Sequence, residues 1–208
     1  MTHGWDDEDP ENFLRILEKT SVARSWCREF ILKHAKSLLE VGVGGLNERR
    51  ALGKMGFIGD YTGTDVTWNF IENGIKHYPE DDWVHIDCNN LLHKVYEKHD
   101  VVYSQHVLEH CAGIGTPLSN MLRLARKHVV NIFFMNPSDT QELINWNQYP
   151  RYHNTYSKVH IGTICEAHGF YHEFKEFSNA EYLHLPRVDR DPPIPTKETV
   201  LIATRKEQ

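Results

Sequence analysis

Short hydrophobic runs alternate with amphipathic segments over most of the chain, and the two patterns predict different elements. The hydrophobic runs predict strands at 37–41, at 83–87, at 100–104, at 129–134 and in a segment that ends at Asp65. Apolar residues at helical spacing predict helices from 46, from 67 to about 77, through 91 and 95, and through 118–125. Parallel strands need crossover helices to connect them, so this alternation predicts an α/β fold with helices on both faces of a parallel sheet.

The two ends of the chain add further elements. Val22, Trp26 and Phe30 recur at helical spacing and predict an amphipathic helix over 21–36, with a shorter helix upstream around 13–17. We therefore expect an N-terminal helical extension at 1–36 and one domain at 37–208. Near the C-terminus, Ser157 caps a predicted helix that Gly169 ends. Strands at 170–177 and 200–203 then follow without a helix between them.

The composition is that of a globular domain, with 208 residues of which 40% are hydrophobic and 25% are charged. A formal net charge of −6 argues against a basic surface along the whole chain for nucleic acid. The four cysteines form no CxxC pair, which favours free thiols in a reducing compartment. The N-terminus is acidic, unlike a signal peptide, and the apolar runs are too short to span a membrane. We therefore expect a cytoplasmic protein without membrane contact.

Acidic residues recur where the first three predicted strands end, at Glu40, Asp65 and Asp87. Ligands of open α/β sheets bind at the carboxyl ends of the strands, so these three carboxylates are expected to meet at one edge. The glycines at 42, 44 and 45 follow the first strand and let the backbone approach a ligand closely. Asp65 lies twenty residues after Gly45, a separation that suits a carboxylate bound to a ribose. The pattern predicts a nucleoside ligand.

The segment LLEVGVGG at 38–45 resembles the first motif of the class I S-adenosylmethionine-dependent methyltransferases. The resemblance extends to about residue 203, with Asp65 matching the ribose-binding acid and residues 100–110, DVVYSQHVLEH, matching the fourth-strand motif. It implies a Rossmann-like, mostly parallel sheet of seven strands with an antiparallel final strand. It also implies S-adenosylmethionine as the cofactor, bound by Glu40, Gly42, Gly44, Gly45, Asp65, Asp87, Cys88, Ser104 and His106. Where the family often has another glycine this chain has Leu46, and we expect Gly45 to relax the turn.

Methyl transfer from a sulfonium is a direct displacement, so the protein must mainly align the reacting atoms and exclude water. A base is needed only if the acceptor loses a proton, and His106 and His153 are the candidate catalytic bases. We expect a small-molecule acceptor, methylated on oxygen or nitrogen and held under the connection at 135–157. The aromatic residues of this connection either line the acceptor pocket or pack the loop onto the sheet: Trp146, Tyr149, Tyr152 and Tyr156.

A ribose 2′-O-methyltransferase for RNA that uses a divalent ion is one alternative. It would take its ligands from His106, Glu109, His110 and His153, whose spacing resembles the metal-binding pattern of such enzymes. His106 stands where that pattern has a glutamate, and we assign no metal ligands. Nucleic acid is not favoured, because the cationic residues between 24 and 54 are typical of solvated helix faces.

Two further alternatives concern the activity rather than the acceptor. A nicotinamide-dependent oxidoreductase would have the pattern G-x-G-x-x-G, but Asn47 stands in place of its last glycine, so this reading is least favoured. A non-catalytic protein of the same fold, acting as a binding or regulatory subunit, would have no physical reason to keep three clustered carboxylates. The sequence leaves the oligomeric state and the identity of the acceptor open.

Overall fold

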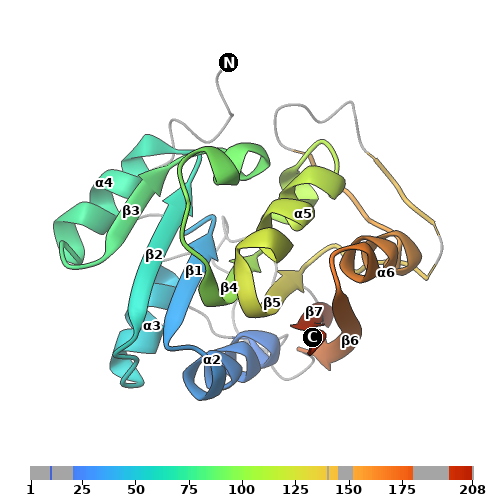
Figure 1. The fold of residues 1–208 in the computed structure, drawn as a ribbon, viewed down its shortest axis with the longest axis horizontal. Helices are drawn as coiled ribbons and strands as arrows, with labels where there is room; N and C mark the ends of the chain where they lie inside the picture. The colour runs from blue at the N-terminus through green and yellow to red at the C-terminus, as the bar shows by residue number, and fades with distance from the viewer. Residues whose placement is uncertain (1–9, 11–20, 140, 145–151, 180–196, 208) are drawn as a thin grey trace.

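The computed structural model describes Pro10 and residues 21–139, 141–144, 152–179 and 197–207. These residues form a sheet of seven strands in the order β3-β2-β1-β4-β5-β7-β6 (Figure 1). Strands β1 to β5 pair in parallel, whereas β7 runs antiparallel to both β5 and β6. The predicted α/β class, the mostly parallel seven-stranded sheet and the antiparallel final strand are therefore confirmed.

The elements follow the predicted alternation of strands and helices. The strands are β1 Ser37–Val41, β2 Asp60–Asp65, β3 Asp82–His85, β4 His99–Gln105, β5 Ala125–Phe133, β6 Phe170–Ser178 and β7 Lys197–Arg205. The α-helices are α2 Val22–His34, α3 Asn47–Lys54, α4 Trp68–His77, α5 Gly115–Leu124 and α6 Lys158–Ala167. Two short 3-10 helices, η1 Cys88–His93 and η2 Leu108–His110, follow β3 and β4.

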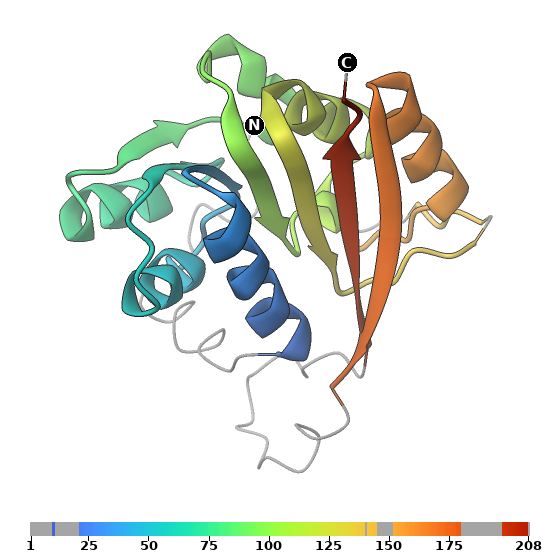
Figure 2. The ribbon, with the colours of Figure 1, turned by 60° about the horizontal axis from the view of Figure 1, so that its bottom comes forward.

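Apolar clusters on the two faces of the sheet hold the helices in place. On one face, Leu39 and Val41 of β1 pack with the apolar sides of η1, α5 and α6. On the other face, Leu38 packs with Cys27 and Ile31 of α2. Figure 2 shows α2 along one face of the sheet and α5 and α6 on the opposite face. Successive residues of β1 point to opposite faces, and because helices cover both faces all five residues of the strand are buried.

Local sequence explains where two of the helices begin and where one ends. The Ser21 hydroxyl accepts a hydrogen bond from the backbone N–H of Arg24 at 3.2 Å and caps α2. Ser157 caps α6 in the same way, through the N–H of His160 at 3.3 Å. Gly169, with φ +77°, follows α6 in the left-handed conformation that glycine adopts without strain.

The third strand and the helix after it are among the predicted elements whose bounds differ in the structure. The third strand ends at His85 rather than at residue 87, because Asp87 instead caps η1 and accepts a hydrogen bond from the N–H of Asn89 at 2.8 Å. The helix expected through 91 and 95 is the 3-10 helix η1, which ends at His93. The helix expected around 13–17 lies outside the described residues.

Candidate functional site

The glycine loop after β1 turns at the carboxyl edge of the sheet, where the loops after β2 and β4 also lie. Gly42 and Gly44 have φ values of +79° and +47°, which residues with a Cβ rarely adopt. A Cβ on Gly42 would lie only 2.3 Å from Cγ2 of Val107, in the loop after β4. Glycine at position 42 is therefore required both by the backbone conformation and by the close approach of these two loops.

The sequence predicts that Gly45 relaxes this turn, but the structure places the positive φ at the next residue. Leu46 itself adopts the left-handed conformation, with φ +64°, and stands at the N-cap of α3. A non-glycine residue there costs about 1 kcal/mol or more. The Leu46 side chain is fully buried against Val43, Phe70 and Ile71, and this burial offsets the strain.

Asp65, the last residue of β2, is tied directly to the glycine loop. Its Oδ2 accepts a hydrogen bond from the N–H of Gly44 at 3.0 Å, and its Oδ1 accepts one from the N–H of Thr67 at 2.9 Å. Burial raises the pKa of Asp65 to about 6, although these backbone hydrogen bonds favour the ionised form. Each carboxylate oxygen keeps acceptor capacity for a further donor, such as a ribose hydroxyl.

Glu40 lies beneath this loop, with 3% of its surface exposed. Its Oε2 accepts a hydrogen bond from the hydroxyl of Tyr61 at 2.5 Å. Burial raises the pKa of Glu40 to about 8, and the carboxylate of Glu48 acts in the same direction. At neutral pH the side chain therefore holds a proton that a nearby ligand cation would displace.

Asp87 and Cys88 lie at the start of η1, close to the segment that follows β4. The sulfur atoms of Cys88 and Cys111 are 3.4 Å apart, so the loops after β3 and β4 meet here. Asn120 of α5 donates from its side-chain amide to the carbonyl oxygens of Cys88 and Asn89 and fixes this turn. The third predicted carboxylate thus lies on a loop held to the same edge.

Ser104 and Gln105 end β4, and their side chains point inward rather than toward the ligand edge. The Ser104 hydroxyl is fully buried and donates to the Asn131 side chain. With its amide oriented to suit its neighbours, Gln105 accepts from Arg24 at 2.7 and 2.9 Å and donates to Glu48 at 3.1 Å. If Ser104 contacts a cofactor, it does so through its backbone.

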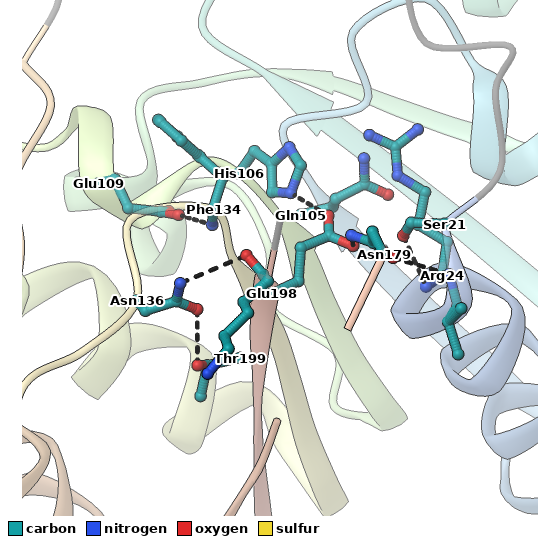
Figure 3. A network of polar contacts seen from close by, with 12 residues as sticks. Ser21, Arg24, Gln105, His106, Glu109, Phe134, Asn136, Asn179, Glu198 and Thr199 are labelled. Atoms are coloured by element: carbon teal, nitrogen blue, oxygen red, sulfur yellow. Dashed lines mark hydrogen bonds and ion pairs between the residues drawn. The ribbon is translucent and has the colours of Figure 1, made fainter. Parts of the chain in front are cut away.

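His106 follows β4 and belongs to a polar network around Glu198 that sequence reasoning did not find (Figure 3). Its Nε2 lies 2.8 Å from Oε1 of Glu198, near the start of β7. The Asn179 side chain donates to Oε2 of Glu198 at 3.1 Å and accepts from the N–H of Val22 at 3.3 Å. The only sequence signal for Glu198 was an acid just before the apolar run at 200–203.

The residues of the proposed metal pattern are close together but do not form a ligand cluster. His110 and His153 rings lie 5.1 Å apart, and both rings pack against Phe134. Glu109 is fully buried, and its Oε1 accepts from the N–H of Phe134 at 2.7 Å. In the part of the chain that the structure describes, no group of three or more His, Cys, Asp or Glu residues could hold a metal ion.

The connection at 135–157 is partly described, and its later part is anchored to η2. Tyr156 is buried, and its hydroxyl donates to the carbonyl oxygens of Leu108 and Cys111. The N–H of Asn154 donates to the carbonyl oxygen of Glu109 at 2.9 Å. Tyr156 therefore packs this connection onto the fold, while Trp146 and Tyr149 lie outside the described residues.

Three arginines of the cationic stretch between 24 and 54 are buried or paired with acids. Arg24 and Arg28 are 5% and 8% exposed, and Arg28 forms a two-point ion pair with Glu48 at 2.7 Å. Arg49 pairs with Asp81 and Glu80. These arginines join α2 and α3 to their surroundings, so they do not provide the surface that nucleic acid would need.

The polar groups at this edge fit an S-adenosyl cofactor. The Asp65 and Asp87 carboxylates can accept hydrogen bonds from a nucleoside, and Glu40 provides an acid for an amino group. The glycines of the loop have no side chains, so a cofactor can approach the backbone closely there. The contacts of Gly42 with Val107 and of Gly44 with Asp65 bring the first motif, the ribose-binding acid and the fourth-strand motif together.

A family model described as a methyltransferase domain matches residues 39–133. A search of the curated proteins gives no match. Within the described residues, no helix is both long enough and apolar enough to cross a membrane.

Several solved structures share the fold. Magnesium protoporphyrin IX methyltransferase from Synechocystis PCC 6803, with bound SAH, is 12% identical with a TM-score of 0.66, over 97% of this chain and 96% of that chain. The 1,6-didemethyltoxoflavin-N1-methyltransferase of Burkholderia thailandensis, with its acceptor and S-adenosylhomocysteine bound, is 14% identical with a TM-score of 0.63, over 96% and 92%. A putative methyltransferase of Haloferax volcanii in complex with the Trm112 activator is 11% identical with a TM-score of 0.70, over 98% and 97%.

Residues 39–133 are thus a methyltransferase domain, and the chain has the fold of methyltransferases crystallised with S-adenosylmethionine or S-adenosylhomocysteine. The predictions of a methyltransferase and of S-adenosylmethionine as its cofactor are confirmed at this level.

Proposed function

We propose that the chain, through the methyltransferase domain at 39–133, transfers a methyl group from S-adenosylmethionine to a small-molecule acceptor, on oxygen or nitrogen. The observation that carries the proposal is the hydrogen bond between the Gly44 N–H and the Asp65 carboxylate. It joins the glycine loop to the acid expected to bind the ribose, at the edge where ligands of such sheets bind.

In this proposal each residue that binds the cofactor contacts one part of it. Asp65 accepts hydrogen bonds from the ribose hydroxyls, and Asp87 with the backbone of Cys88 contacts the adenine. Glu40 faces the amino group of the methionine part. Gly42, Gly44 and Gly45 leave room for the cofactor along the loop, and the backbone of Ser104 and His106 borders its reacting end.

Bound S-adenosylmethionine supplies an electrophilic methyl group on a sulfonium. The chain's own residues hold the acceptor in line and take its proton if it must lose one. His106 is the favoured base, because its ring is partly exposed at 17% and lies beside Phe134 at the same edge. His153 is the second candidate base, since its ring also packs against Phe134, with the ring centroids 5.7 Å apart.

A small acceptor is favoured over nucleic acid by the charge distribution. The net charge of −6 and the pairing of Arg28 and Arg49 with acids argue against a continuous basic surface. The Burkholderia neighbour binds a small acceptor, which supports the same class here. A cytoplasmic location is part of the proposal and is supported by the four free cysteines.

Isothermal titration of the full chain tests the cofactor. We expect S-adenosylmethionine and S-adenosylhomocysteine to bind and NAD not to bind. Asp65→Ala should weaken binding at least tenfold without unfolding the protein. Asp60→Ala is the matched control, because Asp60 is an exposed acid at the opposite end of the same strand and should leave affinity unchanged.

The titration also separates the alternatives. Binding of NAD alone would overturn the methyltransferase proposal, and equal affinity in Asp65→Ala would show that the ribose lies elsewhere. Enhancement by a divalent ion would favour the metal-dependent alternative. Binding without any transfer to a broad acceptor panel would favour the non-catalytic alternative.

A further inference from the structure

The His106 imidazole is held in one orientation by its backbone and by a buried acid. Its φ of +54° is a left-handed conformation that non-glycine residues seldom adopt. Such a conformation costs about 1–3 kcal/mol and persists only where the surroundings hold it. Here the Nε2–Oε1 contact of 2.8 Å with Glu198 aims the ring across the end of β4 (Figure 3).

Glu198 is itself held by donors from outside the matched domain. Only 1% of its surface is exposed, and Asn179 donates to its Oε2 at 3.1 Å. The Ser21 hydroxyl at the start of α2 also helps to lower the pKa of this carboxylate. Burial alone would raise the pKa of Glu198, but the hydrogen bonds from His106, Ser21 and Asn179 hold it below its ordinary value.

An ionised Glu198 determines which nitrogen of His106 carries the proton. A carboxylate only accepts, so Nε2 must be protonated and Nδ1 keeps its lone pair. Burial lowers the pKa of His106, the bond to Glu198 opposes this, and the charge of Arg24 lowers it further. The charged groups that face the ring are Arg24, Glu198 and Glu48, and the ring is neutral at physiological pH.

We infer that Glu198 is a positioning residue that presents the Nδ1 lone pair of His106 to a methyl acceptor of the hydroxyl class. The inference rests on the proposed function for the identity of the reaction. A neutral amine already has a free lone pair for attack, whereas an alcohol or phenol gains most from losing its proton as it attacks. A base aligned by a buried carboxylate therefore selects the hydroxyl acceptor.

The transfer balances without any further reactant. The acceptor O–H bond breaks as Nδ1 takes the proton, the new O–CH3 bond forms, and the bond from methyl to sulfur breaks. The bonding electrons stay on sulfur, which becomes a neutral thioether, and the proton leaves His106 to solvent. Nothing is oxidised or reduced.

Nitrogen NMR of the full chain with labelled histidine tests the positioning role. The chain has 14 histidines, and the His106 signals are those missing from His106→Asn. We expect a protonated Nε2 and an unprotonated Nδ1 in the wild type, and a mixture of tautomers in Glu198→Gln. Asn179→Ala keeps the carboxylate but removes one donor, and it should shift the mixture in the same direction by less.

Two outcomes would overturn the positioning role. One is a proton on Nδ1 in the wild type. The other is an unchanged tautomer in a folded Glu198→Gln variant. The measurement needs no cofactor, so it remains readable even if S-adenosylhomocysteine fails to bind, which would instead count against the proposed function.

The acceptor class is tested on the same sample with S-adenosylhomocysteine present. Catechol serves as the hydroxyl probe and benzylamine as the amine probe. We expect saturating catechol to move the His106 Nδ1 resonance through a new hydrogen bond, and the shift to vanish in Glu198→Gln while S-adenosylhomocysteine still binds by calorimetry. A shift with benzylamine alone, or with neither probe, would overturn the hydroxyl assignment.

Discussion

The N–H of Gly44 donates a hydrogen bond to Oδ2 of Asp65 at 3.0 Å, across 21 residues of sequence. The bond closes the glycine loop over the end of β2 and fixes the carboxylate that is proposed to hold the ribose. The conformation of the glycine loop therefore depends on whether the Asp65 carboxylate is ionised. Changes at Asp65 should therefore alter cofactor affinity and loop conformation together.

Asp65→Asn tests this connection through pH. Because burial raises the pKa of Asp65 to about 6, lowering the pH below 6 protonates the wild-type carboxylate and removes acceptors for the ribose. We expect affinity for S-adenosylhomocysteine to fall as the pH drops from 7 to 5. In Asp65→Asn the affinity should be lower at pH 7, by tenfold or more, and should fall less steeply over this range than in the wild type, because only the proton release of Glu40 then contributes. Calorimetric titration at three pH values measures both effects.

Glu40 should release a proton when the cofactor binds. Burial and the Glu48 carboxylate raise the pKa of Glu40 to about 8, so the side chain is mostly protonated at pH 7. The methionine ammonium lowers that pKa, and up to about one proton then leaves. Titrations with S-adenosylhomocysteine in phosphate and in Tris measure the release from the difference in heat.

Glu40→Gln is the control for this prediction, because it keeps the size of the side chain and cannot release a proton. The buffer dependence of the heat should disappear in this variant. The same proton release in Glu40→Gln and in the wild type would show that Glu40 does not face the ammonium group.

Position 46 should reverse the usual preference for alanine over glycine. Leu46→Ala and Leu46→Gly both lose a buried side chain, which costs about 2–5 kcal/mol. At φ +64°, however, only glycine is free of strain, so Leu46→Gly should be the more stable of the two, by up to about 1 kcal/mol. Urea unfolding of both variants measures the order.

Ala51→Gly is the matched comparison within α3. Ala51 lies inside this helix, where glycine should cost about 0.5–1 kcal/mol relative to alanine. The strain assigned to Leu46 is wrong if Leu46→Ala is the more stable variant at position 46 as well.

The sequence predicted the strands and the acids at their ends because both depend on local pattern. Each strand of β1, β4 and β5 reads as an apolar run, and an acid at the carboxyl end of a parallel strand reaches the ligand edge whatever the rest of the chain does. Leu46 shows the limit of such reasoning. The glycine beside it suggested a flexible turn, but the positive φ fell on the leucine, and only the backbone reveals that.

The pairing of His106 with Glu198 could not be predicted in the same way. The two residues are 92 positions apart, and they meet because β7 enters the sheet between β5 and β6. The sequence placed the last strand from residue 200, two positions after Glu198, whereas pairing with β6 extends it back to Lys197. Similarly, Arg28 was assigned to a solvated face because its partner Glu48 lies on the next helix.

Glu109 should make the fold less stable as the pH rises. Burial raises the pKa of Glu109 to about 8, well above the value of about 4.3 expected in the unfolded chain. Between these two values the unfolded state binds fewer protons than the folded state, so the free energy of unfolding decreases with pH, by at most about 1.4 kcal/mol per pH unit from this group. Urea unfolding at pH 5, 6, 7 and 8 measures the slope.

Glu109→Gln isolates this contribution from that of Glu40, whose raised pKa acts in the same direction. The variant cannot ionise at position 109, and its amide oxygen can still accept from the N–H of Phe134. Any fixed cost of the amide is the same at every pH. The stability of Glu109→Gln relative to the wild type should therefore increase steadily from pH 5 to pH 8. Parallel curves would mean that Glu109 is already ionised in the folded protein, and that its buried, unpartnered Oε2 atom has found a compensating donor.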